Sequence, residues 1–124
     1  MLFKFKFCDS CYIFRPLRTS HCNICNNCML KYDHHCVWLG SCVAKRNYNL
    51  FYWFVFHLTL MIVLITWLCG LNVLVHYRES EDYGYTLKAH WPSVVVAAVA
   101  ILFSTFVFAL LGFHSYIISE GLTT

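Results

Sequence analysis

Two long runs of apolar residues dominate the second half of the chain. The first run extends from Leu50 to about Val75 and the second from Trp91 to Ile118, and neither contains Asp, Glu, Lys or Arg. A helix needs about 20 apolar residues to cross the hydrocarbon core of a bilayer. The remaining residues are too few to surround a pair of buried core helices with a soluble domain. The pattern therefore predicts two transmembrane helices, one over residues 50–76 and one over residues 91–118.

The polar segments that flank these runs differ in charge. Residues 1–49 hold seven of the nine Lys and Arg residues and two carboxylates, whereas residues 77–90 carry two basic and three acidic residues. Basic segments stay on the cytoplasmic side of a membrane. We therefore expect a cytoplasmic domain over residues 1–49, an extracytoplasmic or lumenal loop over residues 77–90, and the start of a cytoplasmic tail at residues 119–124. The host membrane is expected to be the endoplasmic reticulum, the Golgi or the plasma membrane.

Cysteine is concentrated in the predicted cytoplasmic domain, which holds seven of the eight Cys residues. In a reducing compartment, dense Cys and His argue for metal rather than for disulfides. The formula C-x2-C-x9-H-x6-C occurs twice, with the second copy offset by fourteen residues and interleaved with the first. The two quartets are Cys8, Cys11, His21 and Cys28, and Cys22, Cys25, His35 and Cys42. Three thiolates and one imidazole are typical of structural zinc, so we expect two zinc ions, with the identity of the ligands a firmer prediction than their pairing.

The overall composition agrees with a membrane protein and argues against a nucleic-acid partner. The 124 residues are 60% hydrophobic and 12% charged, which is far from the balance of a soluble domain. The formal net charge is +3. Two zinc ions and six ligand thiolates would add a charge of −2 and lower it to +1. A basic aromatic surface around Tyr12, Phe14, Arg15 and Arg18 remains a weaker nucleic-acid candidate, and we expect no such binding.

Three reactive side chains are left over once the eight ligands are removed. Asp33, His34 and Cys36 surround the ligand His35 in the stretch DHHC. A thiol becomes a useful nucleophile when an imidazole accepts its proton and an acid orients that imidazole. Neighbouring histidines of an extended backbone face opposite ways, so His34 can turn towards Cys36. The alternative is that Cys36 is a spare ligand or an inert thiol, because the same offset of fourteen relates it to Cys22.

The stretch from Cys8 to Phe51 resembles the cysteine-rich domain of the DHHC protein S-acyltransferases, also called palmitoyltransferases. The motifs that carry the resemblance are CDSC, RPLRTSHCNICNNC, DHHC and CVAKRNYNLF. The resemblance implies transfer of a fatty acyl group from acyl-coenzyme A to a protein cysteine, through a thioester on Cys36. His34 would be the general base and later acid, and Asp33 the group that orients it. The implied partners are the lipid bilayer, palmitoyl-coenzyme A and protein substrates with membrane-proximal cysteines.

Further positions match the family more loosely. Arg18 and Lys45 look suited to coenzyme A phosphates, although a solvated surface explains them equally well. Trp38, Phe51 and Phe54 look placed near the acyl chain, although aromatic residues at a membrane are commonly lipid contacts. Thr123 and Thr124 resemble the start of the family's TTxE motif.

The chain also departs from the family. Val37 stands where proline is usual, which leaves the catalytic turn freer, and family members generally have two further helices before the cysteine-rich domain. We therefore expect a fragment, a truncated product or a variant that recruits other helices. The predicted fold is an α-helical integral membrane protein, with a small two-zinc cysteine-rich domain of short hairpins and loops before two transmembrane helices. The competing function is a membrane-tethered zinc adaptor, or an inactive truncated relative, that binds protein partners.

Overall fold

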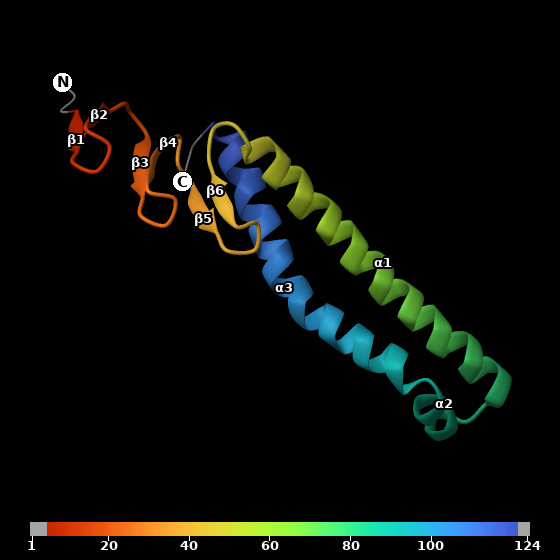
Figure 1. The fold of residues 1–124 in the computed structure, drawn as a ribbon. Helices are drawn as coiled ribbons and strands as arrows, with labels where there is room; N and C mark the ends of the chain where they lie inside the picture. Colours follow the sequence, from red (N-terminus) through yellow and green to blue (C-terminus); the bar gives the residue numbers. More distant parts are fainter. Residues whose placement is uncertain (1–4, 122–124) are drawn as a thin grey trace. The chain divides into compact units, whose positions relative to one another are not determined.

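The computed structural model describes residues 5–121, which form three β-hairpins followed by three helices. Each hairpin is a separate two-stranded antiparallel sheet (Figure 1). The strands pair as β1 (Lys6–Cys8) with β2 (Ile13–Arg15), β3 (Thr19–Cys22) with β4 (Asn27–Leu30), and β5 (His34–Cys36) with β6 (Ser41–Val43). The chain divides into two compact units, residues 1–52 with 116–124, and residues 53–115.

The fourteen-residue offset of the sequence is the repeat length of the hairpins. The loops between the paired strands contain Tyr12, Asn26 and Gly40, which are fourteen residues apart and have φ of 53°, 47° and 60°. A positive φ reverses the chain tightly and is uncommon outside glycine. Each hairpin turn therefore ends on a residue of positive φ, even though only the third uses a glycine.

Little apolar surface is buried by the hairpins themselves. The buried residues around the third hairpin are Cys36, Cys42, Val43 and Ala44. Backbone bonds join the second hairpin to the segment after the third, since the N–H of Lys45 donates to the carbonyl of Leu30 at 3.0 Å. Such a small core cannot stabilise a domain of this size without another contribution.

The helices agree with the predicted membrane class, but they run further than the apolar pattern indicated. Helix α1 (Tyr48–Ser80) and helix α3 (Trp91–Ser119) have 33 and 29 residues and are long and apolar enough to cross a membrane. At 1.5 Å per residue, α1 is about 50 Å long. The segment predicted as a loop, residues 77–90, instead contains the last turn of α1 and the short helix α2 (Tyr83–Ala89).

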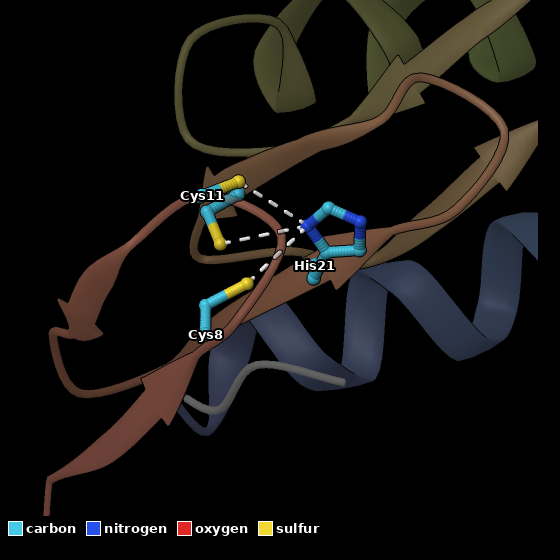
Figure 2. A group of neighbouring side chains, drawn as sticks. Cys8, Cys11 and His21 are labelled. Atoms are coloured by element: carbon cyan, nitrogen blue, oxygen red, sulfur yellow. Dashed lines mark hydrogen bonds between the residues drawn. The ribbon is translucent and has the colours of Figure 1, made fainter.

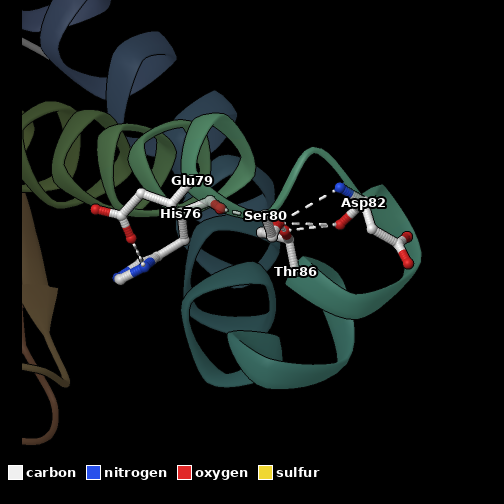
Figure 3. A network of polar contacts seen from close by, with 5 residues as sticks. All are labelled: His76, Glu79, Ser80, Asp82 and Thr86. Atoms are coloured by element: carbon white, nitrogen blue, oxygen red, sulfur yellow. Dashed lines mark hydrogen bonds and ion pairs between the residues drawn. The ribbon is translucent and has the colours of Figure 1, made fainter.

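A network of polar contacts shapes the corner between α1 and α2 (Figure 3). Glu81 adopts a φ of 55° just after the end of α1. Asp82 then caps α2, because its side chain accepts hydrogen bonds from two backbone N–H groups at 2.7 and 3.2 Å. The hydroxyls of Ser80 and Thr86 are 2.7 Å apart, and Thr86 is buried. Charged and hydroxyl side chains in a sequence are typical of loops, but in this segment they cap helix α2 and connect it to α1.

Candidate active site and two metal clusters

The first predicted quartet lies together in the first two hairpins. The Nδ1 atom of His21 lies 3.5 Å from the Sγ of Cys8, 3.4 Å from that of Cys11 and 3.8 Å from that of Cys28. Figure 2 shows Cys8 and Cys11 directed at this nitrogen. A tetrahedral zinc ion with ordinary Zn–S and Zn–N bonds would separate nitrogen from sulfur by about 3.5 Å. The four side chains therefore have the donor set and the spacing of a metal site.

The second quartet repeats this geometry one hairpin further along. The Nδ1 atom of His35 lies 3.7, 3.4 and 3.6 Å from the sulfurs of Cys22, Cys25 and Cys42. Within each quartet all ligand atoms lie within 4.8 Å of one another. None of these cysteines forms a disulfide. The structure thus brings together both predicted quartets, with the pairing that the spacing indicated.

Strand pairing explains why the spacing repeats. His21 lies directly opposite Cys28 across β3 and β4, and His35 lies directly opposite Cys42 across β5 and β6. Directly opposed residues have their Cβ atoms about 5 Å apart on one face of the sheet. The six residues between His and the last Cys are therefore the four-residue loop of the hairpin and one residue of each flanking strand.

Without a cation, the clusters retain protons. Burial, together with hydrogen bonding to neighbouring thiols, raises the pKa of Cys28 and that of Cys42 to about 12. A hydrogen bond from the backbone of Cys25 contributes most to lowering the pKa of Cys22 to about 6. Several buried thiolates repel one another, so only a bound cation allows all three in a cluster to ionise together.

A carboxylate–imidazole pair lies on the third hairpin, beside the second cluster. The Nδ1–H of His34 donates to Oδ2 of Asp33 at 2.8 Å. The Asp33 side chain is only 5% exposed, whereas that of His34 is 40% exposed. The other oxygen of Asp33, Oδ1, is buried and has no hydrogen-bond partner among the described residues. Asp33 therefore selects the tautomer in which His34 presents an unprotonated Nε2.

Cys36 lies on the same strand but outside both metal clusters. Residues two apart in a strand face the same side, so the side chains of His34 and Cys36 share one face of β5. Cys36 ends β5 as Cys8 ends β1 and Cys22 ends β3. The repeat breaks three residues later, where Leu39 occupies the position that corresponds to the second cysteine of each quartet. A buried thiol without the rest of a ligand set is left at this point.

Comparison with known proteins shows to which family the chain belongs. The family model described as DHHC palmitoyltransferase matches residues 2–124. The chain belongs to the DHHC palmitoyltransferase family. It is 44% identical to Probable protein S-acyltransferase 6 of Arabidopsis thaliana over 99% of its own length and 30% of that protein. It is 43% identical to mouse Palmitoyltransferase ZDHHC14 and 40% identical to human Palmitoyltransferase ZDHHC18, covering 98% of this chain in each case.

The chain spans only part of these relatives, 24% of the mouse protein and 31% of the human one. The family resemblance stated from the motifs is thus confirmed. The activity, substrates and partners of these longer relatives are therefore not assigned to this chain by the comparison.

The residues predicted for acyl-coenzyme A are dispersed over the DHHC chain. Phe51 is buried and its ring contacts that of His34 edge to face, with centroids 5.3 Å apart. Trp38 is 94% exposed on the loop of the third hairpin, and Phe54 is half-exposed. Arg18 is exposed and adopts a φ of 61°. The predicted TTxE-like residues Thr123 and Thr124 lie outside the described part of the chain.

Asn47 matches a position that the resembled family tends to keep, but the sequence assigned it no role; in the structure it joins the third hairpin to α1. Its Oδ1 accepts from the N–H of Ala44 at 2.8 Å, and its Nδ2 donates to the carbonyl of Cys42 at 2.9 Å. Asn47 lies one residue before α1. An asparagine just before an apolar helix is a recognised start signal, and this position was the available clue.

Proposed function

We propose that this chain carries the catalytic segment of a protein S-acyltransferase, which moves a fatty acyl group such as palmitoyl from acyl-coenzyme A to a protein cysteine. The observation that carries the proposal is the Asp33–His34 hydrogen bond on the strand that also bears Cys36. This thiol lies outside both metal clusters of the described residues. The family membership of the chain supports the same chemistry.

The reaction would proceed in two thioester exchanges. Nε2 of His34 takes the proton of the Cys36 thiol, and the thiolate attacks the carbonyl carbon of acyl-coenzyme A. The carbon–sulfur bond to coenzyme A breaks, and its thiolate leaves with the proton from His34. A substrate cysteine then gives its proton to His34 and attacks the acyl group on Cys36. The Cys36 thiolate leaves, and His34 returns the proton to it. Asp33 stabilises the imidazolium in both steps.

We further propose that both clusters hold zinc. Three thiolates and one histidine at tetrahedral spacing form a closed set, which suits a structural ion with no open position. In small zinc domains the ion supplies on the order of 10 kcal/mol of folding free energy. These ions would hold the hairpins, and through His35 the backbone on which His34 and Cys36 lie. They take no part in the transfer.

Acyl-coenzyme A would be bound by basic residues and by aromatic residues. Arg18 and Lys45 are proposed to contact the coenzyme A phosphates, since Arg and Lys both bind phosphate. Trp38, Phe51 and Phe54 are proposed to contact the acyl chain. The excess of basic residues before α1 supports a cytoplasmic zinc domain, in the endoplasmic reticulum, the Golgi or the plasma membrane. Substrates would be proteins with cysteines near the membrane.

The test is labelling of the purified, zinc-loaded chain by a clickable palmitoyl-coenzyme A. We expect a label that hydroxylamine removes, that is absent from Cys36→Ser and that is retained in Cys69→Ser, the cysteine outside the cysteine-rich segment. Zinc content at two per chain in all three proteins shows that the domain is folded. An unlabelled wild-type chain with two zinc ions would refute catalysis by this segment and favour the adaptor function.

A further inference from the structure

A cavity of about 710 Å³ lies in the hairpin unit, and none of the three proposed catalytic residues lines it. Met29 and Leu30 of β4 contribute an apolar side, and Lys45 and Arg46 contribute a basic side. Cys28 and Cys42, one residue of each metal cluster, also line the cavity, but the clusters do not account for its two cations, of which only Lys45 is assigned to the proposed acyl donor.

The two basic residues of the cavity lie on a segment of backbone that hydrogen bonds fix in place. The N–H of Lys45 is bonded to Leu30, and the preceding and following residues, Ala44 and Asn47, are bonded to each other at 2.8 Å. Both side chains are exposed. Within residues 5–121, the salt bridges found involve other residues, so neither cation has a carboxylate partner. Two adjacent unneutralised cations on a rigid segment attract an anion, and the guanidinium of Arg46 can bind a phosphate through two hydrogen bonds.

The position of this segment in the chain indicates the source of the phosphate. Residues 44–47 lead directly into α1, which begins at Tyr48 and is long and apolar enough to span a membrane. The residues just before a spanning helix lie in the headgroup layer, where basic pockets bind anionic lipid headgroups. The positive end of the α1 dipole adds to the attraction. The apolar side chains of Met29 and Leu30 suit the glycerol and first methylenes of a lipid.

We propose that this cavity binds the phosphate group of an anionic phospholipid, with Lys45 and Arg46 as its ligands. Coenzyme A also carries phosphates, and Lys45 is among the residues proposed to contact it, so phosphate esters are the shared chemistry. The lipid is favoured because the basic pair adjoins the membrane helix. The inference does not depend on acyl transfer.

The experiment titrates the full chain in neutral detergent with dioctanoyl phosphatidic acid, dioctanoyl phosphatidylcholine and coenzyme A, and measures binding by native mass spectrometry. We expect phosphatidic acid to bind at least tenfold more tightly than phosphatidylcholine. The double variant Lys45→Gln with Arg46→Gln should lose about tenfold or more of that affinity. Arg46→Lys should lose less, because it keeps the charge and lacks the bidentate geometry.

The matched control is Arg78→Gln with Lys88→Gln, which removes the same charge from residues after the apolar part of α1. This control should bind phosphatidic acid within twofold of the wild type, and all variants should retain two zinc ions. Equal binding of both lipids, or equal loss in the control pair, would overturn the proposal. Binding of coenzyme A at Lys45 and Arg46 without phosphatidic acid would assign the cavity to the acyl donor instead. Cys36→Ser should abolish the acyl label and leave lipid binding unchanged, which separates this inference from the proposed reaction.

Discussion

Replacement of Asn47 by alanine should weaken the second metal cluster and leave the first intact. The substitution removes two hydrogen bonds, one of them to the carbonyl of the ligand residue Cys42. Each is worth about 1 kcal/mol, and the N–H of the buried Ala44 loses its partner at a further cost of about 1 kcal/mol. The third hairpin, which holds part of the second cluster, therefore loses about 2–3 kcal/mol of stabilisation. This corresponds to a loss of zinc affinity of about 30-fold or more.

The assay is a chelator titration of the zinc-loaded chain, with the released zinc measured by a metallochromic dye. The variant should release one of its two zinc ions at a markedly lower chelator concentration than the wild type. Asn47→Asp keeps an acceptor for Ala44 and loses the donor to Cys42, so it should lie between the two. The matched comparison is Asn27→Ala, which removes an exposed side-chain hydrogen bond to the N–H of Cys28 in the first cluster and should therefore leave the second cluster unchanged. Simultaneous early release of both ions, or release at the wild-type chelator concentration, would show that the two hydrogen bonds of Asn47 do not support the second cluster.

Three further predictions concern the site and the clusters. Asp33→Asn should lower the rate of Cys36 acylation by about 100-fold or more, because the amide no longer selects the tautomer of His34. Both zinc ions should be retained. An unchanged labelling rate would contradict the proposed role of the carboxylate. Zinc binding to the metal-free chain at pH 7 should release at least about one proton per site, because Cys28 and Cys42, with a pKa of about 12, are protonated there and must ionise. Calorimetry in two buffers of different ionisation enthalpy counts these protons, and no difference between buffers would be the contrary result. Trp38→Ala should leave zinc affinity unchanged, because the side chain is 94% exposed, while lowering acylation; a loss of zinc would show a structural role instead.

The membership of the two Cys/His clusters was predictable from residue spacing, because each set of four residues depends on local geometry. A strand end, a tight turn and a cross-strand pair recur every fourteen residues, so the interval between cysteines encodes the shape of one hairpin. The pairing of His21 and His35 with their cysteines followed the spacing for this reason. The membrane class was equally accessible, since it depends on the length and composition of two apolar runs rather than on contacts.

The extent of the helices was predicted less well. The polar stretch after Val75 reads as a loop by composition, but α1 continues to Ser80 and a short helix follows. Asp82 caps that helix, and Thr86 is buried against Ser80. A polar residue that caps a helix or buries its hydroxyl looks the same in a sequence as one that is solvated, so composition alone does not show where the helix ends.

The contacts around His34 depended on the folded chain. The motif places Asp33 next to His34, but the hydrogen bond through Nδ1 and the burial of the carboxylate are properties of the folded hairpin. Phe51 is seventeen residues after His34 in the chain, yet their rings are in contact. The contact forms because α1 begins at Tyr48, directly after Asn47, whose side chain bonds the backbone of the third hairpin. Spacing along a chain encodes local backbone geometry, whereas the approach of two side chains from different elements depends on where each element starts and how it packs. The amino-acid sequence was therefore sufficient for the ligands and the membrane class, and the tertiary structure was needed to show which side chains support the imidazole.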